Sequence, residues 1–398
     1  MSLLKTLLVL VALATPPSAF GAVKVNKTQS AKVWAHLMPW FETKDTSEDG
    51  TWGIHWTMAN RNPDNFIDGS GRRDIATHYY PQDDVYGSGD LAVIERQLNQ
   101  MKYAGIDGIL LDWPGTLPVW DYPKNKANCE AIISQLERMG LEFAIVYEDH
   151  NIQMAADAGF IDHSAKIPTA QADMRYMQEN YFNLPSYIHQ DGRPLLLDFG
   201  PQTFRSPQDW EQIFSVLNPR PVFFTLWEQM NEAAGNSAGE YAWLYVSFML
   251  GLNNFYLYNP SPQKIGVVYP GFHTFYQDGG WPGPTWNIPH NGVDSFRQTL
   301  ELALQHGHPI QIATWNDYGE GTMIEPTREF GNGFLDMLQQ TLVPQYSSTG
   351  VFDTISELYK MRVKYASQKG VQAVLDEVSD ALANLEPERA AEILKTIQ

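Results

Sequence analysis

Two carboxylates three positions apart stand out in the segment Thr314 to Pro326, which reads T-W-N-D-Y-G-E-G-T-M-I-E-P. They are Asp317 and Glu320, and the glycines on both sides of Glu320 allow tight turns that can direct both carboxylates toward one point. Cleavage of a glycosidic bond requires such a pair, because one carboxyl protonates the leaving oxygen while the other acts as base or nucleophile. Two close carboxylates resist simultaneous ionisation, so we expect one pKa to rise toward the working pH.

The residues beside this pair favour a sugar site, although the spacing alone is also compatible with a solvated loop. Trp315 offers a ring that can stack on a sugar, and Asn316 offers an amide that can fix a hydroxyl. Glu325, which precedes a proline, is predicted to be structural. We therefore predict Asp317 and Glu320 as the catalytic residues.

Short apolar runs rich in β-branched and aromatic residues recur along the chain, with amphipathic stretches between them. This pattern is typical of repeated βα units and a parallel sheet. The eight predicted strands are Val33 to Trp40, Gly108 to Trp113, Phe143 to Glu148, Pro194 to Phe199, Val222 to Trp227, Tyr241 to Ser247, Ile265 to Tyr269 and Ile310 to Trp315. The predicted helices between them are Asp90 to Ala104, Asn125 to Met139, Thr169 to Asn180, Pro207 to Leu217 and Val293 to His306. The sequence therefore predicts an α/β fold, a (β/α)8 TIM-type barrel with long βα loops and a C-terminal helical appendage.

Several predicted strands end in the same way, with apolar residues followed by an acidic or aromatic residue. The acids at these ends are Asp112, Glu148, Asp198, Glu228 and Asp317. Each one alone could be a capping or loop-solvating acid. The C-terminal ends of barrel strands form the catalytic face of this fold, so five acids in register predict a common cavity.

The first connection, from Phe41 to Gly89, is unusually long and rich in aromatic residues. Loops of this length inside a compact domain are usually functional or disordered, and the aromatic content argues against disorder. Aromatic rings stack on pyranose faces, and polar side chains bind the hydroxyls, although each ring also has an interpretation as core packing. The predicted substrate-binding residues are Trp40, His55, Trp56, His78, Tyr79, Tyr80, Asp112, Trp113, Glu148, Asp149, Trp227, Glu228, Tyr269, Trp315 and Asn316.

The composition of the chain restricts the partners and cofactors that the protein can bind. The 398 residues include 46 acidic and 27 basic side chains, a formal charge of −19 that predicts repulsion of nucleic acid and of anionic lipid headgroups. No His-x-His or His-Glu-x-x-His spacing occurs, and neither a phosphate-binding nor a dinucleotide-binding glycine motif is present, so we expect no metal and no cofactor. The single cysteine, Cys129, cannot form an intrachain disulfide. We expect a monomer whose partner is a carbohydrate.

Residues 1–22 have the pattern of a secretory signal peptide. Lys5 is followed by an apolar stretch that is too short to span a bilayer, and small residues follow near position 22. We predict three parts: the signal peptide 1–22, a catalytic barrel 23–345, and a helical extension 346–398 that packs on the barrel or, alternatively, forms a small separate module. The mature protein is expected to be secreted or periplasmic, without insertion into a membrane after signal cleavage.

Several motifs resemble glycoside hydrolase families 71 and 99, the α-1,3-glucanases and endo-α-mannosidases, and especially secreted bacterial proteins described as 71/99-like. The segment W-N-D-Y-G-E, from Trp315 to Glu320, is similar to the glucanase pattern. The segments W-A-H-L-M-P-W-F, W-G-I-H-W, T-H-Y-Y-P and G-I-D-G-I-L-L-D-W-P-G resemble the bacterial group. The resemblance covers about Val33 to Tyr365, and it implies a (β/α)8 barrel, no metal requirement, and Asp317 and Glu320 in the catalytic positions.

The chain departs from the mannosidases at the pair itself. Their segment reads N-E-W-H-E-G-T, whereas this chain has N-D-Y-G-E-G-T from Asn316 to Thr322. Asp317 is one methylene shorter than the glutamate that it replaces, so the retaining mechanism of the mannosidases cannot be carried over. We expect Glu320 to be the general acid and Asp317 the base, acting on water or on a substrate hydroxyl.

The sequence thus predicts a secreted glycoside hydrolase that cleaves an α-linked polysaccharide or oligosaccharide of the glucan or mannan type. One alternative is a hydrolase of a decorated or anionic glycan, with Arg61, Arg72 and Arg73 of the first connection as partners for sulfate or uronate. A second alternative is a non-catalytic carbohydrate-binding protein derived from such an enzyme. A third is a metal-dependent barrel hydrolase.

Overall fold

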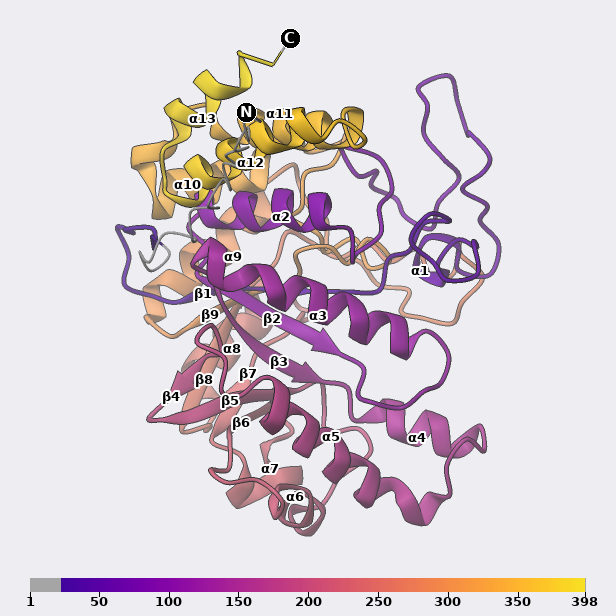
Figure 1. The fold of residues 1–398 in the computed structure, drawn as a ribbon. Helices are drawn as coiled ribbons and strands as arrows, with labels where there is room; N and C mark the ends of the chain where they lie inside the picture. Colours follow the sequence, from indigo (N-terminus) through magenta and orange to yellow (C-terminus); the bar gives the residue numbers. More distant parts are fainter. Residues whose placement is uncertain (1–22, 398) are drawn as a thin grey trace, which may run out of the picture.

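Eight parallel strands close into a barrel in the computed structural model, which describes residues 23–397. The predicted signal peptide 1–22 lies outside the described residues. The strands follow the order β3-β2-β1-β9-β8-β7-β6-β5, and pairing of β3 with β5 closes the ring (Figure 1). They are β1 (Val33–Leu37), β2 (Gly108–Trp113), β3 (Glu142–Tyr147), β5 (Arg193–Asp198), β6 (Val222–Leu226), β7 (Gly239–Tyr241), β8 (Gln263–Val268) and β9 (Ile310–Ile312). The short β4 (His189–Gln190) pairs antiparallel with β5 outside the ring.

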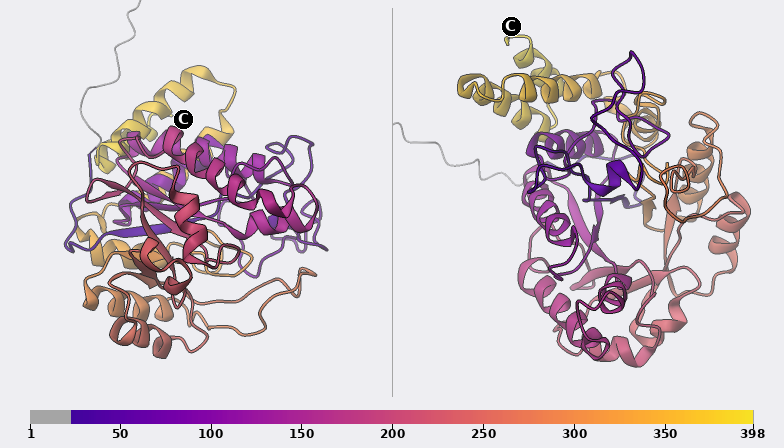
Figure 2. Two further views of the ribbon diagram at one scale, coloured as in Figure 1. Left: turned by 90° about the horizontal axis from the view of Figure 1, so that it is seen from below. Right: turned by 90° about the vertical axis from the view of Figure 1, so that its right-hand side faces the viewer.

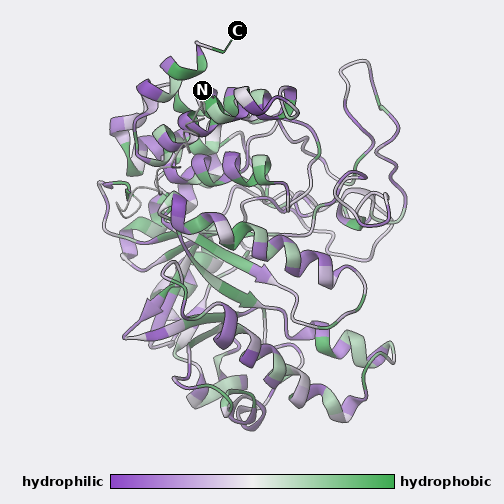
Figure 3. Cartoon of the chain, in the orientation of Figure 1, coloured by the Kyte–Doolittle hydropathy of each residue, from purple (hydrophilic) through white to green (hydrophobic). Residues whose placement is uncertain are grey.

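The barrel strands are buried on both faces, which explains their nearly continuous apolar sequences. Every residue of β1 and β2 is buried, as are the last five of β3. Figure 3 shows apolar residues concentrated on the strands, while the surrounding helices carry polar residues on their outer sides. The predicted (β/α)8 barrel is therefore confirmed.

All eight predicted strands are present, but β7 begins two residues before the predicted start at Tyr241 and ends at that residue. Its first residue, Gly239, lies so close to the neighbouring strand that an added Cβ would be 2.1 Å from the Gln263 carbonyl oxygen. The second, Glu240, is 4% exposed and accepts hydrogen bonds from the Met230 amide at the start of α7 and from the Asn259 side chain. A strand made of a glycine and a buried acid lacks the apolar pattern that identified the others.

Helices surround the barrel and are seen around its rim in the right-hand view of Figure 2. The larger ones before the tail are α2 (Leu91–Tyr103), α3 (Tyr122–Met139), α5 (Lys166–Asn180), α6 (Pro207–Phe214), α8 (Met249–Tyr258) and α9 (Asp294–His306). Capping residues mark several boundaries: the Asp90 carboxylate accepts the Ala92 and Val93 amides at the start of α2, and Gly307 ends α9 at φ +67°. The sequence did not predict α8, whose residues M-L-G-L-N-N-F-Y-L-Y are apolar around most of the helix.

Three further helices lie in the connections that follow the C-terminal ends of strands. They are α1 (Ile54–Thr57), α4 (His150–Asp157) and α7 (Met230–Ala233). The arrows of β2 and β3 in Figure 1 point toward the side where the long first connection and α1 lie. This connection has its own apolar cluster, in which Phe41, Trp56 and Tyr86 pack against Tyr318. The cluster places the first connection directly against the segment that carries the two candidate catalytic acids.

A buried polar network joins α2 to the same segment through Glu325. One oxygen of Glu325 accepts hydrogen bonds from Arg96 and Gln97, each at 2.8 Å, and the other accepts from the hydroxyls of Tyr86 at 2.7 Å and Tyr318 at 3.0 Å. Arg96 also contacts Asp83 at 3.1 Å. Four donors therefore satisfy a carboxylate that is 2% exposed, in agreement with its predicted structural role.

The C-terminal part of the chain is helical and packs against α2. It comprises α10 (Gly333–Leu342), α11 (Val351–Lys364), α12 (Lys369–Ala383) and α13 (Pro387–Leu394). Buried Lys102 donates to the Ala383 carbonyl, Tyr103 donates to the Leu382 carbonyl at 3.1 Å, and Arg362 pairs with Glu95 at 3.0 Å. The domain division at residue 345 stays a prediction. No helix within residues 23–397 is both long and apolar enough to cross a bilayer.

Replacing Arg96 by methionine is expected to destabilise the fold by about 3–5 kcal/mol, because Glu325 and Asp83 would remain buried without a cation. Urea unfolding at pH 7 measures this loss. The matched control is Arg297→Met, which removes an exposed arginine paired with Asp294 and Glu301 and should leave the free energy of unfolding nearly unchanged. Equal effects in the two variants would contradict the structural role of the Glu325 network.

Candidate active site

The strand order brings acidic residues from distant parts of the chain to one end of the barrel. Because β9, β1, β2 and β3 are consecutive neighbours, the segment after β9 lies beside the ends of β2 and β3. Asp317 follows β9, Asp112 is near the end of β2, and Glu148 follows β3. The charge of Asp317 acts on Asp112, which places the two carboxyl groups in the same region.

The turn that carries Asp317 and Glu320 is fixed by its own hydrogen bonds. The Thr314 hydroxyl accepts the Asp317 amide at 2.8 Å, and one Asp317 carboxylate oxygen accepts the Glu320 amide at 3.0 Å. Gly321 has φ +66°, and a Cβ there would be 2.8 Å from the His273 carbonyl oxygen. The predicted need for glycine in this turn therefore has two causes, the left-handed backbone and the close approach of another loop.

Burial governs the electrostatics of the pair. Asp317 is 4% exposed, and burial raises its pKa to about 6, against the opposing effects of the Glu320 amide and of His55. Burial and the charge of Asp317 raise the pKa of Glu320 to about 8, while a hydrogen bond from Tyr276 acts in the opposite direction. Two neighbouring carboxyls with separated pKa values suit a proton donor and a base at neutral pH.

Tyr276, which the sequence did not predict, contacts the pair directly. Its hydroxyl donates to a Glu320 carboxylate oxygen at 3.1 Å. The loop that carries it is tied to the turn by backbone hydrogen bonds from the His273 amide to the Glu320 carbonyl and from the Phe275 amide to the Gly319 carbonyl, both at 2.8 Å. The aromatic residues of this loop hint at a site, but no sequence pattern pairs Tyr276 with Glu320.

A second group of acids adjoins the pair. Burial, followed by the charge of Glu148, raises the pKa of Asp112 well above its usual range. On the other side of this group, the His150 Nδ1 atom lies 2.8 Å from a carboxylate oxygen of Glu148. Asp198 is fully buried, and neither of its carboxylate oxygens has a hydrogen-bond partner among the described residues. A buried carboxyl without partners is unusual, and it adds a further acid to this end of the barrel.

His55 links the first connection to this end of the barrel. Its ring stacks on Trp40 with 4.2 Å between centroids and an angle of 8°, and its Nε2 atom lies 3.7 Å from Asp121. Its charge also acts on Asp317. Trp40 and His55 are both half-buried, so the structure brings these two predicted residues close to the catalytic pair with surface still open.

Several predicted substrate-binding side chains are instead enclosed by protein. Four aromatic residues have no exposed surface: Trp56, Trp113, Trp315 and Tyr269. Trp113 alternates with Asp112 on β2 and therefore points out of the barrel, where its ring lies 6.0 Å from that of Tyr181. Tyr80 is 4% exposed and donates its hydroxyl to Asp84. In this structure these rings are part of the packing of the fold, because the barrel and the first connection enclose them.

Two predicted polar residues bind the backbone. The Asn316 side chain accepts the Met38 amide at 2.8 Å and donates to the Met38 carbonyl at 2.9 Å, so it fastens the catalytic turn to the end of β1. The Asp149 carboxylate is fully buried and accepts three amides of the loop after β5, those of Gln202, Thr203 and Phe204. Both side chains thus hold loops of the site in place.

The remaining predicted residues lie at the rim. His78 stacks on His273 with 3.8 Å between ring centroids, and the Tyr79 hydroxyl lies 3.1 Å from a nitrogen of His290. Trp227 is half-buried against Tyr245, and Glu228 beside it is exposed. The structure places none of these four in contact with Asp317 or Glu320. Within residues 23–397, no cluster of three histidine, cysteine, aspartate or glutamate side chains has the arrangement of a metal site.

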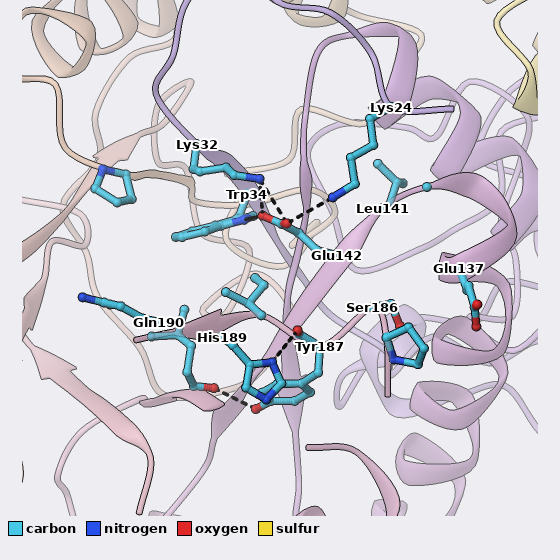
Figure 4. A pocket seen from close by; sticks show the side chains of 15 residues that line it. Lys24, Lys32, Trp34, Glu137, Leu141, Glu142, Ser186, Tyr187, His189 and Gln190 are labelled. Atoms are coloured by element: carbon cyan, nitrogen blue, oxygen red, sulfur yellow. Dashed lines mark hydrogen bonds and ion pairs between the residues drawn. The ribbon is translucent and has the colours of Figure 1, made fainter. Parts of the chain in front are cut away.

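A hollow of about 520 Å³ lies at the opposite end of the barrel, where the strands begin (Figure 4). Its central carboxylate, Glu142, contacts Lys32 at 2.9 Å and accepts the Trp34 ring nitrogen at 2.8 Å. Glu142 is thus neutralised, and Glu137, the other acid of the hollow, is exposed, so the hollow lacks the buried, unpaired acids found at the other end. The C-terminal ends of the strands therefore remain the candidate active site.

Replacing Tyr276 by phenylalanine is expected to raise the pKa of Glu320 further, because a donated hydrogen bond favours the carboxylate form. Carboxyl NMR titration of protein labelled at glutamate measures the shift, and the Glu320→Gln variant identifies the resonance. The control is Tyr176→Phe, which removes a similar bond to Glu130 elsewhere in the molecule. A Glu320 titration that is the same in Tyr276→Phe and in the unmodified protein would refute the contact.

Replacing Glu320 by glutamine is expected to stabilise the fold as the pH rises. The folded-state pKa of about 8 lies above the usual 4.5, so the native carboxyl holds its proton longer than the unfolded one, and this stabilisation is lost between about pH 4.5 and 8. The glutamine variant lacks that loss. Thermal unfolding should therefore show a gain in Tm that increases from pH 4 to pH 8. Glu211→Gln, at an exposed residue paired with Arg220, is the control and should show no such increase.

Comparison with known proteins supports the fold and leaves the sequence relationship distant. No profile of a known protein family and no curated protein matches the chain by sequence. The GH99 endo-alpha-mannosidase from Bacteroides thetaiotaomicron has a similar structure, with a TM-score of 0.58 and 17% identity over 79% of this chain and 96% of that one. A second structure of it, in complex with bis-tris-propane, gives the same TM-score and identity over 80% and 98%. A glycoside hydrolase-like protein gives a TM-score of 0.57 and 13% identity over 83% and 97%. The chain therefore has the barrel fold of these glycoside hydrolases, which confirms the fold implied by the motif resemblance.

Proposed function

We propose that this protein is a secreted glycoside hydrolase that cleaves α-linked glycans of the glucan or mannan type. The observation that carries the proposal is the pair of neighbouring carboxyls, buried Asp317 and half-buried Glu320, at the C-terminal end of a barrel shared with glycoside hydrolases. The similar mannosidase structures make an α-mannan the first substrate to test. The signal-like pattern of residues 1–22 supports secretion.

In the proposed reaction Glu320 is the general acid. Its raised pKa keeps the carboxyl protonated near neutral pH, so that it can protonate the oxygen of the departing sugar. Asp317, whose pKa lies lower, is ionised under the same conditions and acts as base toward water or a substrate hydroxyl. Tyr276 holds the Glu320 carboxyl in position. Asp112 and Glu148 lie where they can bind hydroxyls of the sugar beside the scissile bond.

The positions of the three arginines of the first connection disfavour an anionic substrate. Each already contacts a carboxylate of the protein: Arg61 with Asp74 at 3.4 Å, Arg72 with Asp68 at 2.7 Å, and Arg73 with Asp84 at 3.3 Å. Binding of sulfate or uronate would have to displace these partners. A non-catalytic sugar-binding role is less well supported, because binding of neutral hydroxyls does not require two neighbouring carboxyls with separated pKa values, whereas proton transfer does.

The amide variants Asp317→Asn and Glu320→Gln should each lower glycosidase activity at least 100-fold, roughly the value expected for loss of an acid or a base. The assay is product analysis by NMR after digestion of α-mannan and α-glucan. Glu211→Gln, at an exposed acid, serves as the control and should retain full activity. Full activity in either amide variant would remove that residue from the mechanism.

An aryl glycoside with a good leaving group separates the two roles. Such a substrate needs no protonation of the leaving oxygen, so it should restore much of the activity of Glu320→Gln and little of that of Asp317→Asn. Equal restoration in both variants would contradict the assignment of Glu320 as the acid.

A further inference from the structure

A groove of about 720 Å³ lies beside the catalytic end of the barrel, between the first connection and the segment that leads from β2 into α3. We call it the outer groove. Its walls include Glu42, Trp52, Ile54, Trp120, Asp121 and Met154. Of these, Ile54, Trp120 and Met154 are 46–49% exposed. They come from three separate segments and together form an unusual concentration of exposed apolar surface.

One side-chain pair links the outer groove to the candidate active site. Asp121 lines the groove and lies 3.7 Å from His55, whose ring stacks on Trp40 and whose charge acts on Asp317. A chain that extends from the catalytic pair past His55 would therefore enter this groove.

The wall formed by Trp52 is held rigid before any ligand binds. The indole nitrogen donates to Asp64 at 3.0 Å, and the Arg73 guanidinium lies 5.5 Å from the ring centre. The turn just before it is closed by Asp49, which accepts both the amide and the hydroxyl of Thr51, at 3.0 and 2.7 Å. A preorganised ring loses little conformational entropy on binding, as suits a stacking surface.

Trp120 forms the opposing wall. Its ring is 49% exposed and packs edge-on against Tyr122 and Phe160, each with 5.3 Å between centroids. Its backbone has φ +50°, a left-handed conformation that is unfavourable for a bulky residue. Strained positions that hold a large exposed ring occur most often at functional sites.

The charge of the groove restricts what it can bind. Four of its lining residues are acidic, namely Glu42, Glu48, Asp49 and Asp121, and the single basic one, Lys124, lies 3.7 Å from Glu42. A chain that carries sulfate or carboxylate groups would be repelled by this surface. Uncharged sugars would meet two tryptophan rings and several acceptors for their hydroxyls.

We propose that the outer groove binds the part of an uncharged polysaccharide that continues beyond the bond held at Asp317 and Glu320. This inference rests on the proposed function and adds to it a preference for long, neutral chains. Trp52 and Trp120 stack on the sugars, and the acidic residues exclude anionic polymers. The geometry thus assigns a binding role to Trp120, which lies outside the catalytic machinery.

The test is affinity gel electrophoresis of the Glu320→Gln variant, which binds without cleavage, in gels that contain yeast α-mannan or a soluble α-glucan. Each polymer is also used after sulfation. We expect retention by at least one neutral polymer, weakened about tenfold by Trp120→Ala, and lost when that polymer is sulfated. Tyr258→Ala, which removes a 76% exposed ring on α8, is the control and should leave retention unchanged. Glu48→Lys should increase retention by the sulfated polymer.

The proposal is overturned if no polymer is retained, if Trp120→Ala is retained as strongly as its parent, or if sulfation has no effect. Hydrolysis of the neutral polymer by the unmodified protein is measured in parallel. Cleavage that Trp120→Ala leaves unchanged on long chains would reject the groove and preserve the proposed function. Retention that depends on Trp120, without cleavage by the unmodified protein, would preserve the groove and reject the hydrolase.

Discussion

The segment after β9 contains two buried acids, Asp317 and Glu325, with the half-buried Glu320 between them, and the structure depends on neutralising only Glu325. Glu325 receives Arg96 and three further donors, which fasten the turn to α2 and to the first connection. Asp317 and Glu320, a few residues earlier, form no ion pair within residues 23–397, and the one basic side chain whose charge acts on Asp317 is His55. One satisfied carboxylate thus provides the rigidity that lets Asp317 and Glu320 remain close together and poorly solvated, which is the condition that separates their proton affinities.

The fold was predictable because each barrel strand is enclosed on both faces. Such strands must be apolar over their whole length, and this pattern identified seven of the eight with bounds within a few residues. The exception, β7, is made of Gly239, Glu240 and Tyr241, and its identity as a strand depends on close backbone packing and on a buried acid with specific partners. These properties exist only in three dimensions.

The candidate pair itself was also accessible from sequence, since Asp317 and Glu320 lie in one short segment with glycines that the turn requires. The surrounding residues were less predictable. Whether an aromatic residue at a strand end faces the cavity or the helices depends on the alternation of side chains, and Trp113 and Trp315 proved to be enclosed. Tyr276 was missed because it comes from another loop, and only the closed ring brings that loop to the pair. Trp120 was missed because its exposure and its place in the outer groove depend on the folded loops around it.

The attachment of the Tyr276 loop has a consequence for how such a protein can diverge. Backbone hydrogen bonds to Glu320 and Gly319 make this loop part of the acid's immediate support, so a single inserted residue there would move the proton donor's partner. By contrast, residues 44–72 of the first connection form no hydrogen bond to residues 314–322, so this part can change in length or composition with little effect on the turn. Changes that leave the turn intact are therefore confined to one side of the rim, because the other side is held by its backbone bonds to Gly319 and Glu320.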